Sequence, residues 1–334
     1  MSPSESGGLA GQRVLVTGGS GFIGRHVVSD LLGAGAHVRV VDLQPHSDPD
    51  VELVQGDIAD GDVLDSALDG GFDGIVHLAA VTSVLRSLEH PEATYRTNVA
   101  ATAGLLEAGR AAGARSLVFA STNAVTGPME APAITEAATL RPLTPYGATK
   151  AAAEMLMSAY TASYGVRCAS LRLTNVYGPG MQAKDSIVAR LMRAIRLGRT
   201  FEIYGDGRQV RDYVHAADVT AAVRLGLQDE RWVGPMVIGA GRSLSVLEVI
   251  EAVRAVTGAE LDVRHGSARA GEMAAVIVDP SKARAAGWQP RYTLEQGLEG
   301  VWEEWSQVDI DAVLSGLGAV AGPGAVPGAV AGSP

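Results

Sequence analysis

The chain has 334 residues, of which 47% are hydrophobic, and a formal net charge of −10 at neutral pH. Its length suits two domains, or one large domain with an added lobe, and its acidic balance argues against a nucleic-acid partner, because phosphate binding requires a basic surface. Cys168 is the only cysteine, which excludes an intramolecular disulfide and a cysteine-based metal site.

The two ends of the chain lack the pattern of a folded domain. Residues 1–12 are rich in Ser and Gly and have no basic segment followed by an apolar one, which argues against a signal peptide. Apolar runs elsewhere are shorter than a membrane span. Residues 316–334 consist only of Gly, Ala, Val, Pro, Leu and Ser. We therefore expect a cytoplasmic protein, not bound to membranes, with disordered tails at 1–11 and 316–334.

The first strong pattern is a strand, a glycine-rich turn and a helix. An apolar strand at 13–17 runs into a turn at 18–24, and a helical stretch follows at 25–33. Gly18, Gly21 and Gly24 have the spacing of a dinucleotide-binding turn, where glycine permits a tight bend and close approach of the backbone to a pyrophosphate. The next strand, 37–42, ends in Asp42, whose carboxylate would accept hydrogen bonds from an adenosine ribose and repel a 2′-phosphate. This order predicts NAD rather than NADP.

Strands and helices then alternate. Apolar strands are expected at 51–54, 74–78 and 116–120, with helices near 63–68 and 91–112. Such alternation predicts a parallel sheet covered on both faces, with ligands bound beyond the carboxyl ends of the strands. Asp57, residues 77–80 and Ser121-Thr122 all follow strand ends on the edge that carries the glycine turn. His77 by itself is more typical of a packed structural residue.

Tyr146 and Lys150 stand at the start of an Ala-rich segment that continues to residue 164. If this segment is helical, positions four apart share one face, so the phenol and the ammonium point into the same space. A nearby cation favours the phenolate of a tyrosine, whose ordinary pKa is about 10. The pair predicts a general base, although the same spacing also occurs by chance on helix surfaces.

Together these motifs give the chain a family resemblance. The resemblance rests on residues 17–24, Asp42, Asp57, 77–80, Asn98-Val99, 121–127, 146–150, 172–179, 205–215, Arg269-x-Gly-Glu272, Asp279, Lys282 and Gly287-Trp288. In this collinear order the chain resembles the extended short-chain dehydrogenases/reductases of the NAD-dependent epimerase/dehydratase family. The resemblance implies an α/β fold with a doubly wound parallel Rossmann sheet, formed by 12–177 and 213–256, and a smaller C-terminal substrate-binding lobe, formed by 178–212 and 257–306.

The resemblance also implies which residues act. The catalytic set would be Thr122, Tyr146 and Lys150, with no metal. The residues expected to contact tightly bound NAD are Gly18, Gly21, Phe22, Ile23, Gly24, Asp42, Asp57, Ile58, Leu78, Ala79, Ala80, Asn98, Tyr146 and Lys150. A nucleotide-diphosphate sugar would be held by Thr122, Asn175, Val188, Arg211 and Arg269, with the two arginines on the diphosphate. By contrast, Arg190, Arg193 and Arg196 on a helix near 187–195 are expected to form a solvated basic face.

Among the reactions of the family, the resemblance favours epimerisation at C4 of a UDP-hexose or UDP-uronic acid through a 4-keto intermediate. Tyr146 would remove the hydroxyl proton, Lys150 would lower the pKa of the tyrosine, and Thr122 would bind the same oxygen. In dehydratases of this fold, Asp and Glu follow the strand-end Ser or Thr, and decarboxylases carry the Glu. Here Asn123 and Ala124 follow instead, and neither transfers protons.

Several alternatives remain open from the sequence. They are a nucleotide-sugar dehydratase or decarboxylase, a net dehydrogenase or 4-ketoreductase that exchanges NAD(H) in each cycle, and a binding or regulatory protein that has kept the fold without the chemistry. Thr126 stands where relatives usually carry Tyr, which leaves the shape of the sugar pocket undetermined. The Ala-rich helices 91–112 and 146–164 resemble the pair that forms the dimer interface in relatives, so we expect a homodimer.

Overall fold

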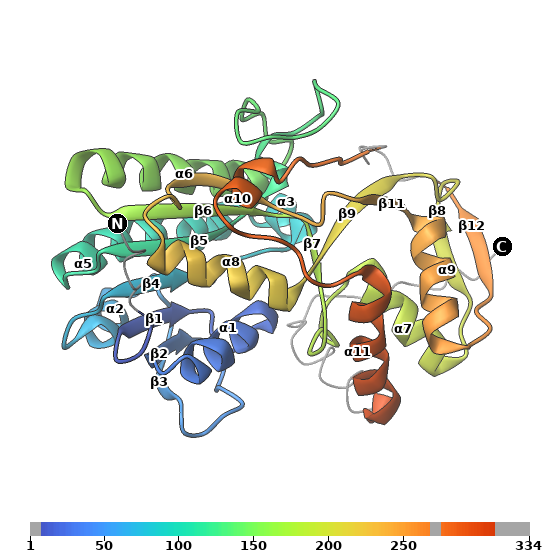
Figure 1. Cartoon of the computed structure of the whole chain (residues 1–334), viewed down its shortest axis with the longest axis horizontal. Helices are drawn as coiled ribbons and strands as arrows, with labels where there is room; N and C mark the ends of the chain where they lie inside the picture. Colours follow the sequence, from blue (N-terminus) through green and yellow to red (C-terminus); the bar gives the residue numbers. More distant parts are fainter. Residues whose placement is uncertain (1–7, 268–274, 311–334) are drawn as a thin grey trace, which may run out of the picture.

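The computed structural model describes residues 8–267 and 275–310, and its larger part is a seven-stranded sheet (Figure 1). The strand order is β10-β6-β5-β4-β1-β2-β3, and every neighbouring pair is parallel. The strands are β1 (Arg13–Thr17), β2 (His37–Asp42), β3 (Glu52–Gln55), β4 (Gly74–His77), β5 (Ser116–Thr122), β6 (Arg167–Leu173) and β10 (Gly234–Ile238). The predicted Rossmann sheet is confirmed.

Helices cover both faces of this sheet. On one face α1 (Phe22–Gly33) packs against α8 (Ala216–Gln228), and on the other lie α2 (Gly61–Leu68), α5 (Ala101–Ala111) and α6 (Pro145–Tyr164). A parallel strand covered on both faces needs apolar side chains on both, which explains why β1 and β4 are continuous buried runs. The polar chemistry is therefore left to the ends of the strands.

The helix expected at 91–112 consists of three pieces. It follows the short α3 (Val84–Glu89) and comprises α4 (Pro91–Tyr95), a π-helical turn at Arg96–Ala100 and α5. π-Turns inside helices are frequent at functional sites. This one carries Asn98, which is buried close to α6.

The start of α6 is sharply defined. Thr144 accepts a hydrogen bond from the backbone N–H of Gly147 at 3.2 Å, and Pro145 occupies the first turn, where its missing N–H does no harm. A Cβ at Gly147 would lie 2.6 Å from the carbonyl oxygen of Ala124. Glycine thus allows α6 to begin directly against the 3₁₀ turn Asn123–Val125 that follows β5, so Tyr146 comes close to the end of that strand.

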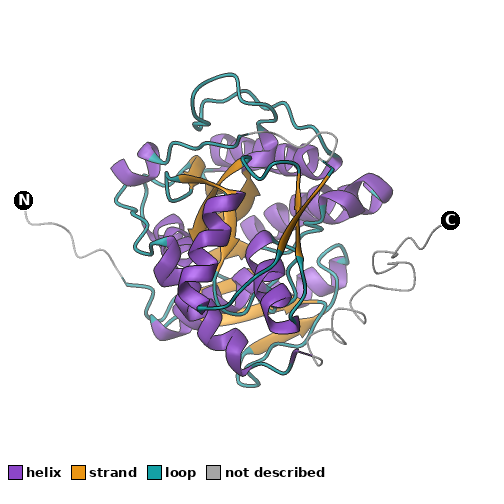
Figure 2. Cartoon of the chain, turned by 90° about the vertical axis from the view of Figure 1, so that its right-hand side faces the viewer, coloured by secondary structure: helices purple, strands orange, loops and turns teal. Residues whose placement is uncertain are grey.

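A smaller lobe has its own apolar core. Its helices α7 (Ile187–Leu197), α9 (Val246–Thr257) and α11 (Leu294–Gln307) pack against the parallel pair β8 (Phe201–Tyr204) and β12 (Val263–Gly266). Between lobe and sheet domain lies a three-stranded sheet of β7 (Asn175–Tyr177), β9 (Val210–His215) and β11 (Ser243–Ser245) (Figure 1). Figure 2 looks onto the lobe side of the molecule, where helices surround these strands.

The packing differs from the predicted domain boundaries in two places. Helix α9 falls, except for its last residue, within 213–256, the segment assigned from sequence to the sheet domain, but Val249 and Val253 lie in the lobe core. Conversely α10 (Ser281–Ala285) and Trp288, assigned to the lobe, lie in the core of the sheet domain, where the Trp288 indole donates to the carbonyl of Asp218 at 2.8 Å. An apolar pattern shows that a face is buried without showing which of two cores buries it.

The expected tails are described only in part. Leu9 is buried in the sheet-domain core, so residues 8–11 form part of the folded domain, and the disorder predicted through residue 11 is wrong for 8–11. Residues 1–7 and the tail 316–334 lie outside the described residues.

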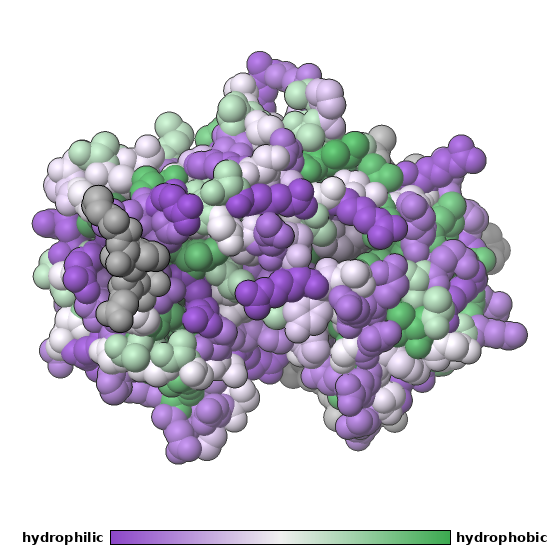
Figure 3. Space-filling view, viewed as in Figure 1, coloured by the Kyte–Doolittle hydropathy of each residue, from purple (hydrophilic) through white to green (hydrophobic). Residues whose placement is uncertain are grey.

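The surface shows a mixed polarity. Figure 3 shows hydrophilic residues interspersed with smaller hydrophobic groups on the face drawn in Figure 1. Within the described ranges, every helix is too short or too polar to cross a lipid bilayer.

Candidate active site

The glycine turn closes against the loop that follows β4. Gly18 has a φ of +73°, and a Cβ there would lie 2.6 Å from the backbone nitrogen of Ala79, so no larger residue fits. Helix α1 begins after Gly21 without a side-chain cap, which leaves its first backbone N–H groups for an anion. A dinucleotide pyrophosphate fits this cradle, and Phe22, Ile23 and Gly24 form the helix start that faces it.

Asp42 ends β2 beside this turn, as expected. Its Oδ2 accepts a hydrogen bond from the N–H of Ser20 at 2.9 Å, and its Oδ1 accepts one from the N–H of Gln44 at 3.0 Å. Each oxygen keeps further capacity to accept hydrogen bonds, for example from ribose hydroxyls. The carboxylate therefore also fixes the glycine turn, which the sequence pattern did not indicate.

The residues that follow β3 line the same edge of the sheet. Asp57 accepts a hydrogen bond from the N–H of Ala59 at 2.9 Å and lies 3.7 Å from the guanidinium of Arg96. The side chain of Ile58 is packed in the core, so only its backbone is left for a ligand.

The loop after β4 is bound to β1. The N–H of Leu78 donates to the carbonyl of Thr17, and the N–H of Ala79 donates to the hydroxyl of Thr17 at 3.3 Å. Leu78, Ala79 and Ala80 are thereby held against the glycine turn.

Two buried polar residues near the site are fully engaged with the protein. Asn98 donates to the carbonyl of Val81 and the hydroxyl of Thr149, and its Oδ1 accepts from the N–H of Val81. No side-chain donor of Asn98 is left for NAD, so Asn98 braces the loop after β4 against α6.

His77 hydrogen-bonds Thr17 and Thr102. Burial, aided by the charge of Lys150, lowers the pKa of His77 to about 3. His77 is a neutral packed residue, as the sequence suggested.

Thr122, Tyr146 and Lys150 come together at the carboxyl end of β5. The ammonium of Lys150 donates to the carbonyl of Ala120 at 2.8 Å and lies 4.5 Å from the centroid of the Phe119 ring. The side chains of Thr122 and Tyr146 are hydrogen-bonded to each other. The geometry therefore brings the three expected catalytic side chains to one place on the ligand-binding edge.

The electrostatics of this group differ from the sequence-based expectation. Burial raises the pKa of Tyr146, and the hydrogen bond from Thr122 opposes this shift. Burial also lowers the pKa of Lys150 to about 7, against the attraction of Glu154. The expectation that Lys150 brings the pKa of Tyr146 below its ordinary value is therefore wrong for the protein by itself, because desolvation disfavours both charged forms.

The expected substrate residues are distributed over the junction and the lobe. Asn175 is exposed and donates to the carbonyl of Asp212 at 2.9 Å. Arg211 lies half-buried on β9 and donates to the carbonyl of Val210. The side chain of Val188 is packed in the lobe core, which leaves its backbone for a ligand. Arg269 lies outside the described residues.

The three arginines of α7 are not a freely solvated face. Arg190 lies over the rings of Phe201 and Tyr204, Arg193 donates to the carbonyls of Gln182 and Lys184, and Arg196 donates to those of Ser306 and Val308. Their guanidinium groups thus tie α7 to its neighbours in the lobe.

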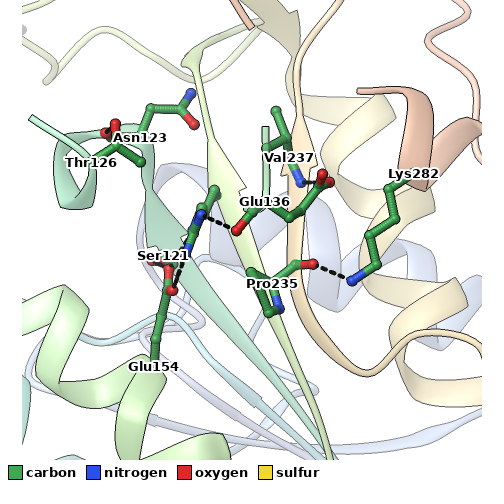
Figure 4. A network of polar contacts seen from close by, with 9 residues as sticks. Ser121, Asn123, Thr126, Glu136, Glu154, Pro235, Val237 and Lys282 are labelled. Atoms are coloured by element: carbon green, nitrogen blue, oxygen red, sulfur yellow. Dashed lines mark hydrogen bonds and ion pairs between the residues drawn. The ribbon is translucent and has the colours of Figure 1, made fainter. Parts of the chain in front are cut away.

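The turn after β5 explains the unusual Thr126. Its hydroxyl donates to the carbonyl of Asn123 at 2.9 Å and is buried, so it stabilises the 3₁₀ turn. The amide of Asn123 donates to the carbonyl of Leu173 at 3.4 Å. Figure 4 shows Asn123 and Thr126 together with Ser121, which the sequence already placed at a strand end, and Glu154, which the sequence pattern did not single out. The only available signal was a glutamate in an otherwise Ala-rich helix, one turn after Lys150.

No group of three or more His, Cys, Asp or Glu side chains arranged to hold a metal ion occurs in the described part of the chain.

Comparison with known proteins agrees with this geometry. The model of the NAD dependent epimerase/dehydratase family matches residues 14–239. The UDP-glucose 4-epimerase of Corynebacterium glutamicum is 33% identical to this chain over 314 aligned residues, which cover 87% of this chain and 94% of that epimerase. The dTDP-glucose 4,6-dehydratase of Mycobacterium tuberculosis is 35% identical to this chain over 309 aligned residues, which cover 86% of this chain and 91% of that dehydratase.

A solved structure extends the likeness to the fold. MoeE5 in complex with UDP-glucuronic acid and NAD has a TM-score of 0.81 and 36% identity to this chain, covering 88% of it and 99% of MoeE5. The similarity runs through the sheet domain and the lobe alike. This chain belongs to the NAD-dependent epimerase/dehydratase family.

Proposed function

We propose that this chain is an NAD-dependent nucleotide-sugar 4-epimerase that acts on a UDP-hexose or UDP-uronic acid. The glycine cradle and Asp42 fit NAD, and MoeE5 is similar over nearly its whole length and was solved with NAD and a UDP-sugar. When bound, NAD supplies the hydride acceptor and donor. Thr122, Tyr146 and Lys150 handle the proton of the C4 hydroxyl.

In this proposal Tyr146 removes and returns that proton, and Thr122 hydrogen-bonds the same sugar oxygen. The raised pKa of Tyr146 suits the step in which the phenol returns its proton. Removal of the proton requires positive charge nearby, and Lys150 is the cation that α6 holds one turn away.

The observation that carries the choice of reaction is the pair of residues after Thr122. Asn123 is 7% exposed and cannot ionise, and Ala124 has no acid or base. Dehydration requires proton transfers at C5 and C6, whereas epimerisation requires only the proton of the C4 hydroxyl and a returned hydride. The similarity to the Mycobacterium dehydratase keeps dehydration as the alternative.

Substrate contacts and assembly belong to the same proposal. Arg211 and Arg269 bind the diphosphate, and Asn175 contacts the substrate.

A second copy of the chain covers α4 and α6 and forms a homodimer with the first. On these helices Tyr95 is 56% exposed and Met155 67% exposed. Because both the cofactor and the sugar nucleotide are intracellular metabolites, the enzyme acts in the cytoplasm. Light scattering of the purified protein at several concentrations tests the dimer, and a monomer at all of them would contradict it.

The decisive experiment is turnover of a sugar panel. UDP-glucose, UDP-glucuronic acid and dTDP-glucose are incubated with purified protein without added NAD(H), and the products are identified by NMR. The C4 epimer is expected without accumulation of NADH. A 4-keto-6-deoxy sugar, a pentose or stoichiometric free NADH would contradict epimerisation.

A further inference from the structure

Three consecutive residues of β5 contact three residues that are spaced one turn apart on α6. The carbonyl of Ala120 accepts from Lys150, the hydroxyl of Ser121 donates to Glu154 at 2.5 Å, and Thr122 is hydrogen-bonded to Tyr146. Two of the contacts involve catalytic side chains. The third, between Ser121 and Glu154, has no part in the proposed chemistry.

Glu154 also forms a buried ion pair. The guanidinium of Arg172 on β6 donates to Glu154 through Nε at 3.1 Å and through Nη2 at 2.8 Å, and the two side chains are 3% and 5% exposed. Arg172 additionally donates to the carbonyl of Glu136, whose carboxylate accepts from the N–H of Val237 on β10 (Figure 4). Glu154 is thereby connected to β5, β6 and β10, on the side of α6 that carries Lys150.

A pair of this kind is not explained by stability alone. Burying two charges is expensive, and apolar residues of similar size often stabilise a protein equally well or better. The pair instead supplies direction, because the planar guanidinium and the carboxylate meet in one geometry. That geometry sets the position of α6 along β5.

We propose that Glu154, held by Arg172 and Ser121, is a positioning residue that places Lys150 at the end of β5. The inference rests on the proposed function insofar as Lys150 takes part in turnover. The effect of Glu154 on Lys150 can nevertheless be measured without turnover. The groups that interact electrostatically with Lys150 are His77 on β4 and Glu154 on α6; Tyr146 lies one turn earlier on α6, and Arg172 on β6 is paired with Glu154. The carboxylate of Glu154 opposes the lowering of the Lys150 pKa by burial.

The charge on Lys150 can be measured directly, because the chain contains only three lysines, Lys150, Lys184 and Lys282. Protein labelled with ¹³C at lysine Cε gives three NMR signals, and Lys150→Met identifies the one of interest. The midpoint for Lys150 is expected near 7 in wild type and lower in Glu154→Gln, since the change removes the anion that favours the ammonium. Glu251→Gln, in an exposed pair with Arg254 on α9, is the matched control and should leave the midpoint unchanged.

Turnover provides the second readout. Glu154→Gln is expected to lower kcat about tenfold to a hundredfold with little change in KM, because the catalytic groups are misplaced while the substrate contacts remain. The alkaline limb of the kcat profile should move to lower pH together with the Lys150 midpoint. Ser121→Ala, which leaves the ion pair intact, should show a smaller change in the same direction.

The double variant Glu154→Gln/Arg172→Met separates positioning from folding. Its melting temperature should recover relative to Glu154→Gln, because no unpaired buried charge remains, while kcat should stay low. Recovery of kcat together with the melting temperature would show a merely structural pair and overturn the proposal. An unchanged titration midpoint of Lys150 in Glu154→Gln would overturn the proposal for Glu154 even if no sugar is turned over. A wild-type protein without activity on any sugar would refute only the proposed function.

Discussion

Replacement of Tyr146 by Phe is the most direct perturbation of the proposed chemistry. It deletes one oxygen from a half-buried side chain and keeps the ring. The protein loses the hydrogen bond between this oxygen and Thr122, while the Lys150 contact to the carbonyl of Ala120 stays. The fold and the glycine cradle are therefore expected to remain intact.

The two consequences of this change differ in size. Loss of one side-chain hydrogen bond lowers the free energy of unfolding by about 0.5–1.5 kcal/mol. Loss of a general acid–base group lowers the rate about 10²–10⁴-fold. At about 1.36 kcal/mol for each tenfold change, this corresponds to roughly 2.7–5.4 kcal/mol of transition-state stabilisation. The kinetic effect thus exceeds any effect on folding.

The assay measures kcat for the active sugar, NAD affinity by calorimetry and the melting temperature on the same preparations. Tyr160→Phe is the matched control, because it also removes a tyrosine hydroxyl from α6, one that donates to the exposed Glu107 at 3.1 Å. The control should keep wild-type turnover. Near wild-type activity of Tyr146→Phe would show that Tyr146 and Lys150 are a chance match to the motif.

Three further predictions follow from other parts of the site. Asp42 at the end of β2 should make NAD bind more tightly than NADP in calorimetry, and the reverse order would refute its role at the ribose. Arg211→Ala should weaken inhibition by UDP about ten- to a hundredfold without changing NAD affinity, and undiminished inhibition would place the diphosphate elsewhere. His77, whose pKa falls from 6.5 to about 3, binds a proton in the unfolded chain before it does so in the folded one. Stability should therefore fall as pH drops from 6.5 toward 3, by up to about 1.4 kcal/mol per pH unit, and urea unfolding of His77→Asn should lack this component.

Much of the site could be predicted from the sequence because its determinants are local. The glycine spacing between β1 and α1 reflects the positive φ of Gly18 and the uncapped start of α1. The helical spacing of Tyr146 and Lys150 places both on one face of α6. Asp42 follows from its place at the end of β2. Each of these features is encoded within a few residues of the chain.

Other features depend on which distant segments meet. Helix α9 and Trp288 have apolar patterns that suit either core, and only packing decides that α9 joins the lobe and Trp288 the sheet domain. The pKa values of Tyr146 and Lys150 depend on burial, which no local pattern specifies.

The buried pair of Glu154 and Arg172 shows the same division most clearly. In the sequence these are a glutamate in a helix and an arginine in an apolar strand, and each is ordinary by itself. The parallel pairing of β5 with β6 and the packing of α6 across them bring the two side chains to within 2.8 Å. The sequence by itself determined the cofactor turn and the tyrosine–lysine pair, because turn geometry and helical period are properties of neighbouring residues. The tertiary structure alone decided the charge and position of Lys150, because these depend on desolvation and on contacts between elements that are distant in the chain.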